Sequence, residues 1–263
     1  MGTDASSNYV EVNGIRMHYN EIGKGEPLIL IHGGLFDANF AWKSYYPILS
    51  QHFRVLAPDS RGHGKSTNPS MELSYKLMCE DIVALIKELE LDRPLIAGYS
   101  DGGQVALEIG INYPEVIRAI IVGGVLAEIS DHYSNSVKSW GIVGPGKADF
   151  DKFHESFSDF VPLLEEMHSV HGVDYWKELF VASSRMWLDP DGFPKDRVKE
   201  IPVPTLVLHG DRDEVIPLDD PLRIYRLVPN AELSIIPNAD HMAASANVDA
   251  VAPIMLEFLK RHE

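Results

Sequence analysis

A serine framed by glycines, between a strand-like and a helix-like segment, constrains this chain more than any other feature. The pentapeptide runs from Gly98 to Gly102 and has Ser100 at its centre. Residues 93–97 before it are apolar enough for a buried strand, and residues 103–110 after it are typical of a helix packed closely on a sheet. A serine on such a sharp strand-to-helix turn presents its hydroxyl to a substrate, and the flanking glycines leave room for the strained backbone. The segment therefore predicts a nucleophilic serine.

Partners for this serine follow further along the chain. A hydroxyl becomes a good nucleophile only when a base takes its proton, and a third group must hold that base in the correct tautomer. His241 follows a predicted strand at residues 232–236, and Asp211 and Asp213 follow a predicted strand at residues 205–209. His241 is the candidate base. The two aspartates compete for the third place, and an ordinary turn would account for Asp211.

Five motifs in this order resemble those of the α/β-hydrolase superfamily over nearly the whole chain. They are a strand ending in His-Gly, a D-x-R-G-x-G-x-S turn, the serine pentapeptide, a G-x-x-D-x-x-x-P loop and a late histidine, at residues 26–35, 54–66, 98–102, 210–217 and 238–241. The superfamily uses Ser, Asp and His in this chain order. The resemblance implies a catalytic triad of Ser100, Asp213 and His241.

The segment His32-Gly33-Gly34-Leu35 is similar to the His-Gly-x loop of these enzymes. A tetrahedral intermediate needs two backbone N–H groups aimed at its oxygen. Asp101, directly after the nucleophile, would supply one, and Gly34 would supply the other, with Leu35 as the alternative. Taken alone, the segment would be explained better by an ordinary strand-ending turn, and the other motifs in register favour the oxyanion loop.

Within the superfamily, the sequence Gly-Tyr-Ser-Asp-Gly-Gly at residues 98–103 and the pair Tyr175-Trp176 look most like the biphenyl-hydrolase-like branch, which includes valacyclovir hydrolase. This resemblance implies that Asp101 holds the amino group of a substrate. A second interpretation stays open, because an acid in the first turn of a helix is favoured by the helix dipole without any ligand.

Strands and helices alternate along the chain, which predicts an α/β fold: a mostly parallel central sheet with helices on both faces. The strands are expected at residues 27–31, 54–57, 94–98, 117–122, 205–209 and 232–236, after a hairpin around Asn13-Gly14. A stretch of about 80 residues without a clear strand interrupts the pattern. The resemblance assigns residues 126–201 to a helical cap inserted after the sixth strand, and residues 1–125 and 202–263 to the hydrolase core. Leu35, Trp176 and Trp187 are expected to bind substrate with Asp101.

Composition excludes several classes of function. The chain has 263 residues and a net charge of -16, which argues against a nucleic-acid partner and against anionic membranes. No apolar run approaches the ~20 residues of a membrane span, and the N-terminus has no secretory-signal pattern, so a cytoplasmic location is expected. His168 and His171 are predicted to lie on a solvated helix end rather than in a metal site.

The sequence thus predicts a serine hydrolase that cleaves small carboxylic esters through an acyl-enzyme, without metal or organic cofactor, as a monomer or homodimer. Two alternatives use the same triad: a perhydrolase or acyltransferase, and a C–C bond hydrolase. The loop at His32-Gly33-Gly34-Leu35 departs from the glycine- and proline-rich loop of C–C hydrolases. A third alternative is a ligand receptor or signalling protein on the same scaffold.

Overall fold

The computed structural model describes residues 5–242 and 246–263. Residues 1–4, the start of the N-terminal segment considered above, lie outside the described residues. Eight strands form one sheet in the order β1-β2-β4-β3-β5-β6-β9-β10. They are β1 (Ser6–Val12), β2 (Ile15–Ile22), β3 (Glu26–Ile31), β4 (Phe53–Pro58), β5 (Leu95–Tyr99), β6 (Ile120–Gly123), β9 (Thr205–Gly210) and β10 (Ala231–Ile236). Strand β2 is antiparallel to both β1 and β4, and all other neighbours are parallel.

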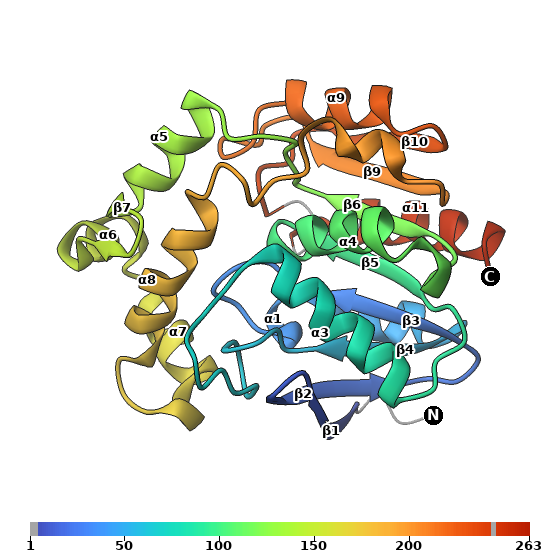
Figure 1. The fold of residues 1–263 in the computed structure, drawn as a ribbon, viewed down its shortest axis with the longest axis horizontal. Coiled ribbons are helices and arrows are strands. Elements are labelled where there is room, and N and C mark those ends of the chain that lie inside the picture. The colour runs from blue at the N-terminus through green and yellow to red at the C-terminus, as the bar shows by residue number, and fades with distance from the viewer. Residues whose placement is uncertain (1–4, 243–245) are drawn as a thin grey trace.

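Helices cover both faces of this sheet (Figure 1). One face carries α3 (Tyr75–Glu88), α4 (Asp101–Asn112) and α9 (Asp219–Leu227), and the other carries α1 (Ala38–Trp42), α2 (Tyr46–Leu49) and α11 (Val248–Arg261). Strand β3 shows how the sequence divides its apolar side chains. Ile29 and Ile31 pack in the first layer, whereas Leu28 and Leu30 pack in the second. The predicted fold class, an α/β-hydrolase fold, is confirmed.

Local sequence explains where several elements begin and end. The β1–β2 hairpin turns at Asn13 and Gly14, whose φ angles of 44° and 77° are those of the turn that Asn-Gly favours. Helix α3 begins after Ser74, whose hydroxyl accepts a hydrogen bond from the Leu77 N–H. The segment between β3 and β4 contains three short helices: α1, the 3-10 helix η1 (Lys43–Tyr45) and α2. Pro47 lies in the first turn of α2, where its missing N–H does no harm.

The segment at residues 126–201, called the insertion below, lies to one side of the sheet in Figure 1. Its elements are α5 (Asp131–Ser139), β7 (Ile142–Gly144), β8 (Lys147–Ala148), α6 (Phe150–Phe157), α7 (Val161–Met167), η3 (Ser169–His171), α8 (Tyr175–Trp187) and η4 (Lys195–Glu200). The β7–β8 hairpin was not expected from the sequence. Helices α6 and α7 are separated near residue 160, and Pro162 lies in the first turn of α7. No helix in the described ranges is both long and apolar enough to cross a membrane.

A buried ion pair joins three parts of the core. Arg61, in the loop after β4, donates from Nε to Oδ2 of Asp81 on α3 at 2.6 Å, and Asn13 of the β1–β2 turn donates to the same carboxylate at 2.8 Å. The two charged side chains are only 4% and 1% exposed. Burial raises the pKa of Asp81, and the Arg61 guanidinium opposes that shift.

We therefore expect Asp81→Ala to lower the free energy of unfolding by about 3–5 kcal/mol, because it leaves the Arg61 charge buried without a partner. Denaturant unfolding measures the loss. The control is the double variant Arg61→Met, Asp81→Leu, which removes both charges and should recover most of the stability. A loss below about 1 kcal/mol in the single variant would show that water or another group compensates Arg61.

Candidate active site

Ser100 lies on the turn between β5 and α4 and has a left-handed backbone. Its φ is 56° and its ψ is -123°, a conformation that non-glycine residues rarely adopt. The turn is held by two backbone hydrogen bonds: the Ser100 N–H donates to the Gly123 carbonyl at 2.8 Å, and its carbonyl accepts from the Gln104 N–H at 3.0 Å. Such strain persists only where surrounding structure enforces it.

Glycines on either side of Ser100 allow the turn to close. A Cβ atom at Gly98 would overlap the carbonyl of Gly102, and one at Gly102 would overlap the carbonyl of Ile31 at the end of β3. The turn is therefore pressed directly against the neighbouring strand, with no room for a side chain at either position. The glycines expected from the pentapeptide have this physical reason in the structure.

The structure brings Ser100, His241 and Asp213 together. His241 Nε2 lies 3.0 Å from Ser100 Oγ, and His241 Nδ1 lies 2.8 Å from Asp213 Oδ2. The carboxylate of Asp213 accepts a hydrogen bond from the Nδ1–H group of His241. This leaves Nε2 unprotonated and able to take the proton of the Ser100 hydroxyl. Of the two aspartates that follow β9, Asp213 therefore contacts His241, and Asp211 instead points toward Arg212, 3.9 Å from its Nε.

Asp213 is fixed by its own loop. Its Oδ1 accepts from the backbone N–H groups of Val215 at 2.9 Å and Ile216 at 2.8 Å. Burial alone would raise the pKa of this fully buried carboxyl, but the hydrogen bonds from His241 and Ile216 and the neighbouring imidazoles outweigh burial and lower it. The group therefore stays ionised at neutral pH, as an orienting acid must.

The segment after β3 lies beside Ser100. A Cβ atom on Gly33 would be 3.2 Å from Ser100 Cβ. The Ser60 N–H donates to His32 Nε2 at 2.8 Å, so His32 Nδ1 carries the proton and donates to the Gly33 carbonyl at 2.6 Å. In a trans peptide the carbonyl and the next N–H point in opposite directions. Fixing the Gly33 carbonyl therefore also fixes the direction of the Gly34 N–H, the candidate oxyanion donor.

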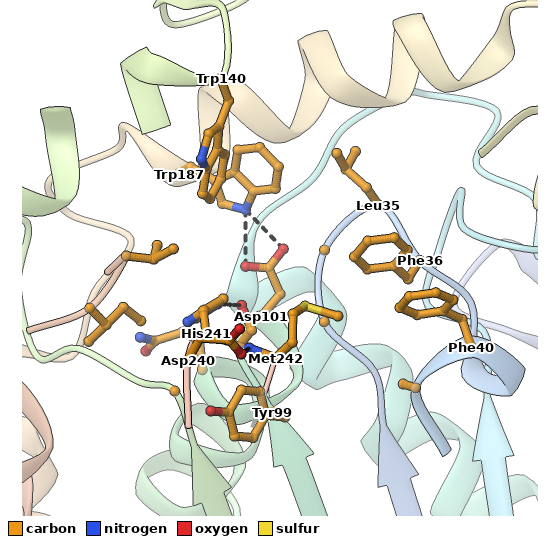
Figure 2. A pocket seen from close by; sticks show the side chains of 18 of the residues that line it. Leu35, Phe36, Phe40, Tyr99, Asp101, Trp140, Trp187, Asp240, His241 and Met242 are labelled. Carbon is orange, nitrogen blue, oxygen red and sulfur yellow. Dashed lines mark hydrogen bonds between the residues drawn. The ribbon is translucent and has the colours of Figure 1, made fainter. Parts of the chain in front are cut away.

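Asp101 is a buried acid at the base of the pocket (Figure 2). The indole N–H of Trp187 lies 3.0 Å and 2.9 Å from its two carboxylate oxygens, and the Tyr75 hydroxyl donates to Oδ1 at 2.8 Å. A Cβ atom at Gly34 would come within 2.6 Å of Asp101 Oδ2. Burial raises the pKa of Asp101, and the hydrogen bonds from Trp187 and Tyr75 only partly oppose it. All its hydrogen-bond donors among the described residues are neutral.

A cavity of about 410 Å³ opens above these residues. Its walls are mostly apolar. The insertion contributes eight lining residues: Leu126, Tyr133, Trp140, Phe153, Phe157, Phe160, Leu164 and Trp187. From the core, Phe36 and Phe40 stack on each other at 4.1 Å on the side of the cavity opposite Trp140 and Trp187 (Figure 2). Its described lining contains no lysine or arginine, and its carboxylates are Asp101, Glu214 and Asp240.

The structure corrects two expectations from the sequence. Leu35 and Trp187 line the cavity as expected, but Trp176 does not: it is 1% exposed and packs against Phe150 and Phe153 inside the insertion. Its expected contact with substrate is wrong. His168 is also 1% exposed, so it does not lie on a solvated helix end. Half-buried His171 lies beside it.

Two tyrosines near the site were not predicted from the sequence. Tyr75 and Tyr133 both line the cavity, and Tyr75 is bonded to Asp101 from 26 residues away. No motif marks either tyrosine. Tyr75 occupies the first position of a helix that is recognisable only by its serine cap and its apolar spacing, and those signals say nothing about what its hydroxyl reaches.

Comparison with known proteins agrees with this geometry. A model described as "Alpha/beta hydrolase family" matches residues 28–254. A "2-hydroxy-6-oxo-6-(2'-aminophenyl)hexa-2,4-dienoic acid hydrolase" of Metapseudomonas resinovorans is 27% identical and covers 96% of this chain and 90% of its own length. The human "Serine hydrolase BPHL" is 26% identical and covers 98% of this chain and 88% of its own length.

A solved structure gives the same result for the fold. A meta-cleavage product hydrolase from Pseudomonas fluorescens IP01 superposes with a TM-score of 0.82 at 24% identity, over 97% of this chain and 98% of the other. The matched family model spans all three residues of the Ser100–His241–Asp213 arrangement. The chain belongs to the α/β-hydrolase family and is a hydrolase.

Proposed function

We propose that the protein hydrolyses small carboxylic esters through an acyl-enzyme on Ser100. The observation that carries this proposal is the chain of hydrogen bonds from Ser100 Oγ to His241 at 3.0 Å and on to Asp213 at 2.8 Å, at the base of an apolar cavity. A serine hydroxyl in that arrangement has both an adjacent base and an acid that sets the tautomer of the base.

The reaction would proceed in two halves. Ser100 Oγ forms a bond to the acyl carbon while His241 Nε2 takes its proton, and His241 then gives that proton to the departing alcohol as the ester C–O bond breaks. In the second half, His241 takes a proton from water, the resulting hydroxide attacks the acyl carbon, and the bond to Ser100 breaks with return of the proton. The N–H groups of Gly34 and Asp101 would hold the oxyanion, with Leu35 as the alternative donor.

The insertion would act as a cap over residues 1–125 and 202–263. Eight of its side chains line the cavity, six of them aromatic. Trp140 and Trp187 meet edge to face at 5.8 Å, and Phe153 and Phe157 lie 5.2 Å apart. Packed aromatic walls of this kind limit the size of the acyl group and exclude water from the reacting centre.

Asp101 supplies the argument for a cationic substrate. Its carboxylate is 5% exposed, lines the cavity and has only the neutral donors Tyr75 and Trp187. A buried carboxylate without a cation is costly, so an ammonium group brought by the substrate would be held strongly. We therefore propose α-amino acid esters as the preferred class, with the amino group against Asp101 and the carbonyl at Ser100.

C–C bond hydrolysis is the second candidate, since the Metapseudomonas resinovorans relative is named for a dienoic acid substrate. Such a substrate brings a carboxylate. The described residues that line the cavity include no lysine or arginine, and they do include Asp101, Glu214 and Asp240. An anionic substrate would meet repulsion there, which favours the ester over the dienoic acid. Turnover of a dienoic acid of this type faster than of any ester would reverse the choice.

The triad makes the first functional prediction. Ser100→Ala should lower kcat for a p-nitrophenyl ester by at least about 10⁴-fold while leaving thermal unfolding unchanged. His241→Ala should lose a similar amount. Because the residues act as one unit, the double variant should lose little more than either single variant. Steady-state ester kinetics measure all three, and near-wild-type turnover in Ser100→Ala would refute the proposed nucleophile.

The second prediction concerns selectivity. Wild type should prefer an α-amino acid ester over the matched ester without the amine by about ten- to hundredfold in kcat/KM, the value of one charge-assisted hydrogen bond. Asp101→Asn keeps the backbone N–H and most of the shape, so it should abolish the preference while retaining hydrolysis of the neutral ester. Equal damage to both substrates would assign Asp101 to the helix start or the oxyanion loop instead.

A third prediction separates the charge of Asp101 from its shape. Because burial raises its pKa in the folded protein, the folded state holds a proton that the unfolded state has lost, and stability falls as pH rises through that range. Asp101→Asn lacks this penalty. Its melting temperature relative to wild type should therefore rise as pH increases above about 4, the ordinary pKa of an aspartate. A difference that stays constant with pH would contradict a buried ionisable carboxyl at this position.

A further inference from the structure

His168 comes from the insertion but contacts two core loops at the active site. It follows α7 directly and is buried. The Gly64 N–H donates to its Nδ1 at 3.0 Å, so that nitrogen carries no proton. Its Nε2 therefore carries the proton and donates to the carbonyl of Leu35 at 2.8 Å. The neutral ring is thus held in one tautomer, and both of its nitrogens are used.

The contact falls on a strained residue of the oxyanion segment. Leu35 has a φ of 63°, a left-handed backbone that non-glycine residues rarely adopt. The Gly33 carbonyl is held by His32 and the Leu35 carbonyl by His168. The peptide between Gly34 and Leu35 therefore lies between two fixed carbonyls. Both candidate oxyanion donors, the N–H groups of Gly34 and Leu35, belong to this clamped stretch.

We propose that His168 is a positioning residue for the hydrolytic reaction: docked from the insertion, it holds the Gly34–Leu35 segment in the geometry that stabilises the oxyanion. This inference rests on the proposed hydrolytic function. It makes the insertion more than a wall of the cavity, because the same contact that seats α7 on the core also sets the donors at Ser100. If the insertion were displaced, the Ser100–His241–Asp213 triad would stay in place, but the oxyanion would be stabilised less well in the transition state.

Only the neutral form of His168 can make both contacts. Protonation of the ring would place an N–H group at Nδ1. That group would face the Gly64 N–H, and the hydrogen bond between the two residues would be lost. The groups that surround the ring are His63 and Tyr175, at ring distances of 6.3 Å and 6.2 Å, and His32, His171 and Asp59 also act on it. Burial lowers the pKa of His168, and the Leu35 carbonyl and Asp59 oppose this only in part. The clamp is therefore complete at neutral pH and is lost as pH falls through that lowered pKa.

Two substitutions separate the contacts of the ring. His168→Gln places an amide nitrogen at the ε position, within reach of the Leu35 carbonyl. His168→Asn places its amide at the δ position, where it can serve Gly64 but falls short of Leu35. His171→Asn is the matched control, because His171 also bonds the Gly64 loop, at 3.1 Å to its carbonyl, without contacting Leu35.

The measurement is kcat and KM for a p-nitrophenyl ester, with thermal unfolding as the check on folding. We expect His168→Asn to lose about 10- to 100-fold in kcat with little change in KM, somewhat less than removal of an oxyanion donor. His168→Gln should stay within about threefold of wild type, and His171→Asn should be unaffected. As pH falls, kcat of His168→Gln relative to wild type should rise, since the glutamine does not titrate and His241 is common to both proteins.

Equal losses in the asparagine and glutamine variants, unchanged kcat in the asparagine variant, or an effect on KM alone would each overturn the role of His168. A flat pH ratio would do the same. Wild-type protein that turns over no ester would instead refute the proposed function, and the positioning role would fall with it. The two failures are thus distinguished by the wild-type measurement.

Discussion

The left-handed backbone of Ser100 is the constraint on which the rest of the site depends. A φ of 56° at a serine is sustained because its N–H bonds to Gly123 on β6 and because Gly102 is pressed against the end of β3. This places Oγ where the carboxyl ends of parallel strands meet. The loops after β3, β9 and β10 emerge at the same edge of the sheet, so the oxyanion segment, Asp213 and His241 all reach the serine without distortion of the core.

The insertion meets this edge through polar contacts as well as through its aromatic wall. Trp187 donates to Asp101, directly after the nucleophile, and His168 donates to Leu35 in the oxyanion segment. Both bonds are buried, where a hydrogen bond is electrostatically stronger than in water and a broken one is costly. In the proposed reaction, substrate selection and transition-state stabilisation would therefore both depend on how the insertion is docked.

Local chemistry in the sequence is sufficient to predict much of this. The pentapeptide around Ser100, the Asn13-Gly14 turn and the apolar strand segments each act within a few residues, and the structure has the corresponding elements within one to three residues of the expected bounds. Contacts between distant segments are different. The partners of His168 are 104 and 133 residues away in the chain, and helical spacing shows that Trp176 faces inward without showing whether it faces the cavity or the interior of the insertion.

The central claim is that His241 activates Ser100 as a nucleophile. Reaction of the wild-type protein with a fluorophosphonate, followed by peptide mapping with mass spectrometry, tests this directly, because the reagent releases fluoride only when an activated hydroxyl attacks phosphorus. The account predicts one adduct per chain, on the peptide that contains Ser100, with a rate that collapses in His241→Ala. Absence of an adduct, an adduct on another residue, or an unchanged rate in His241→Ala would contradict it.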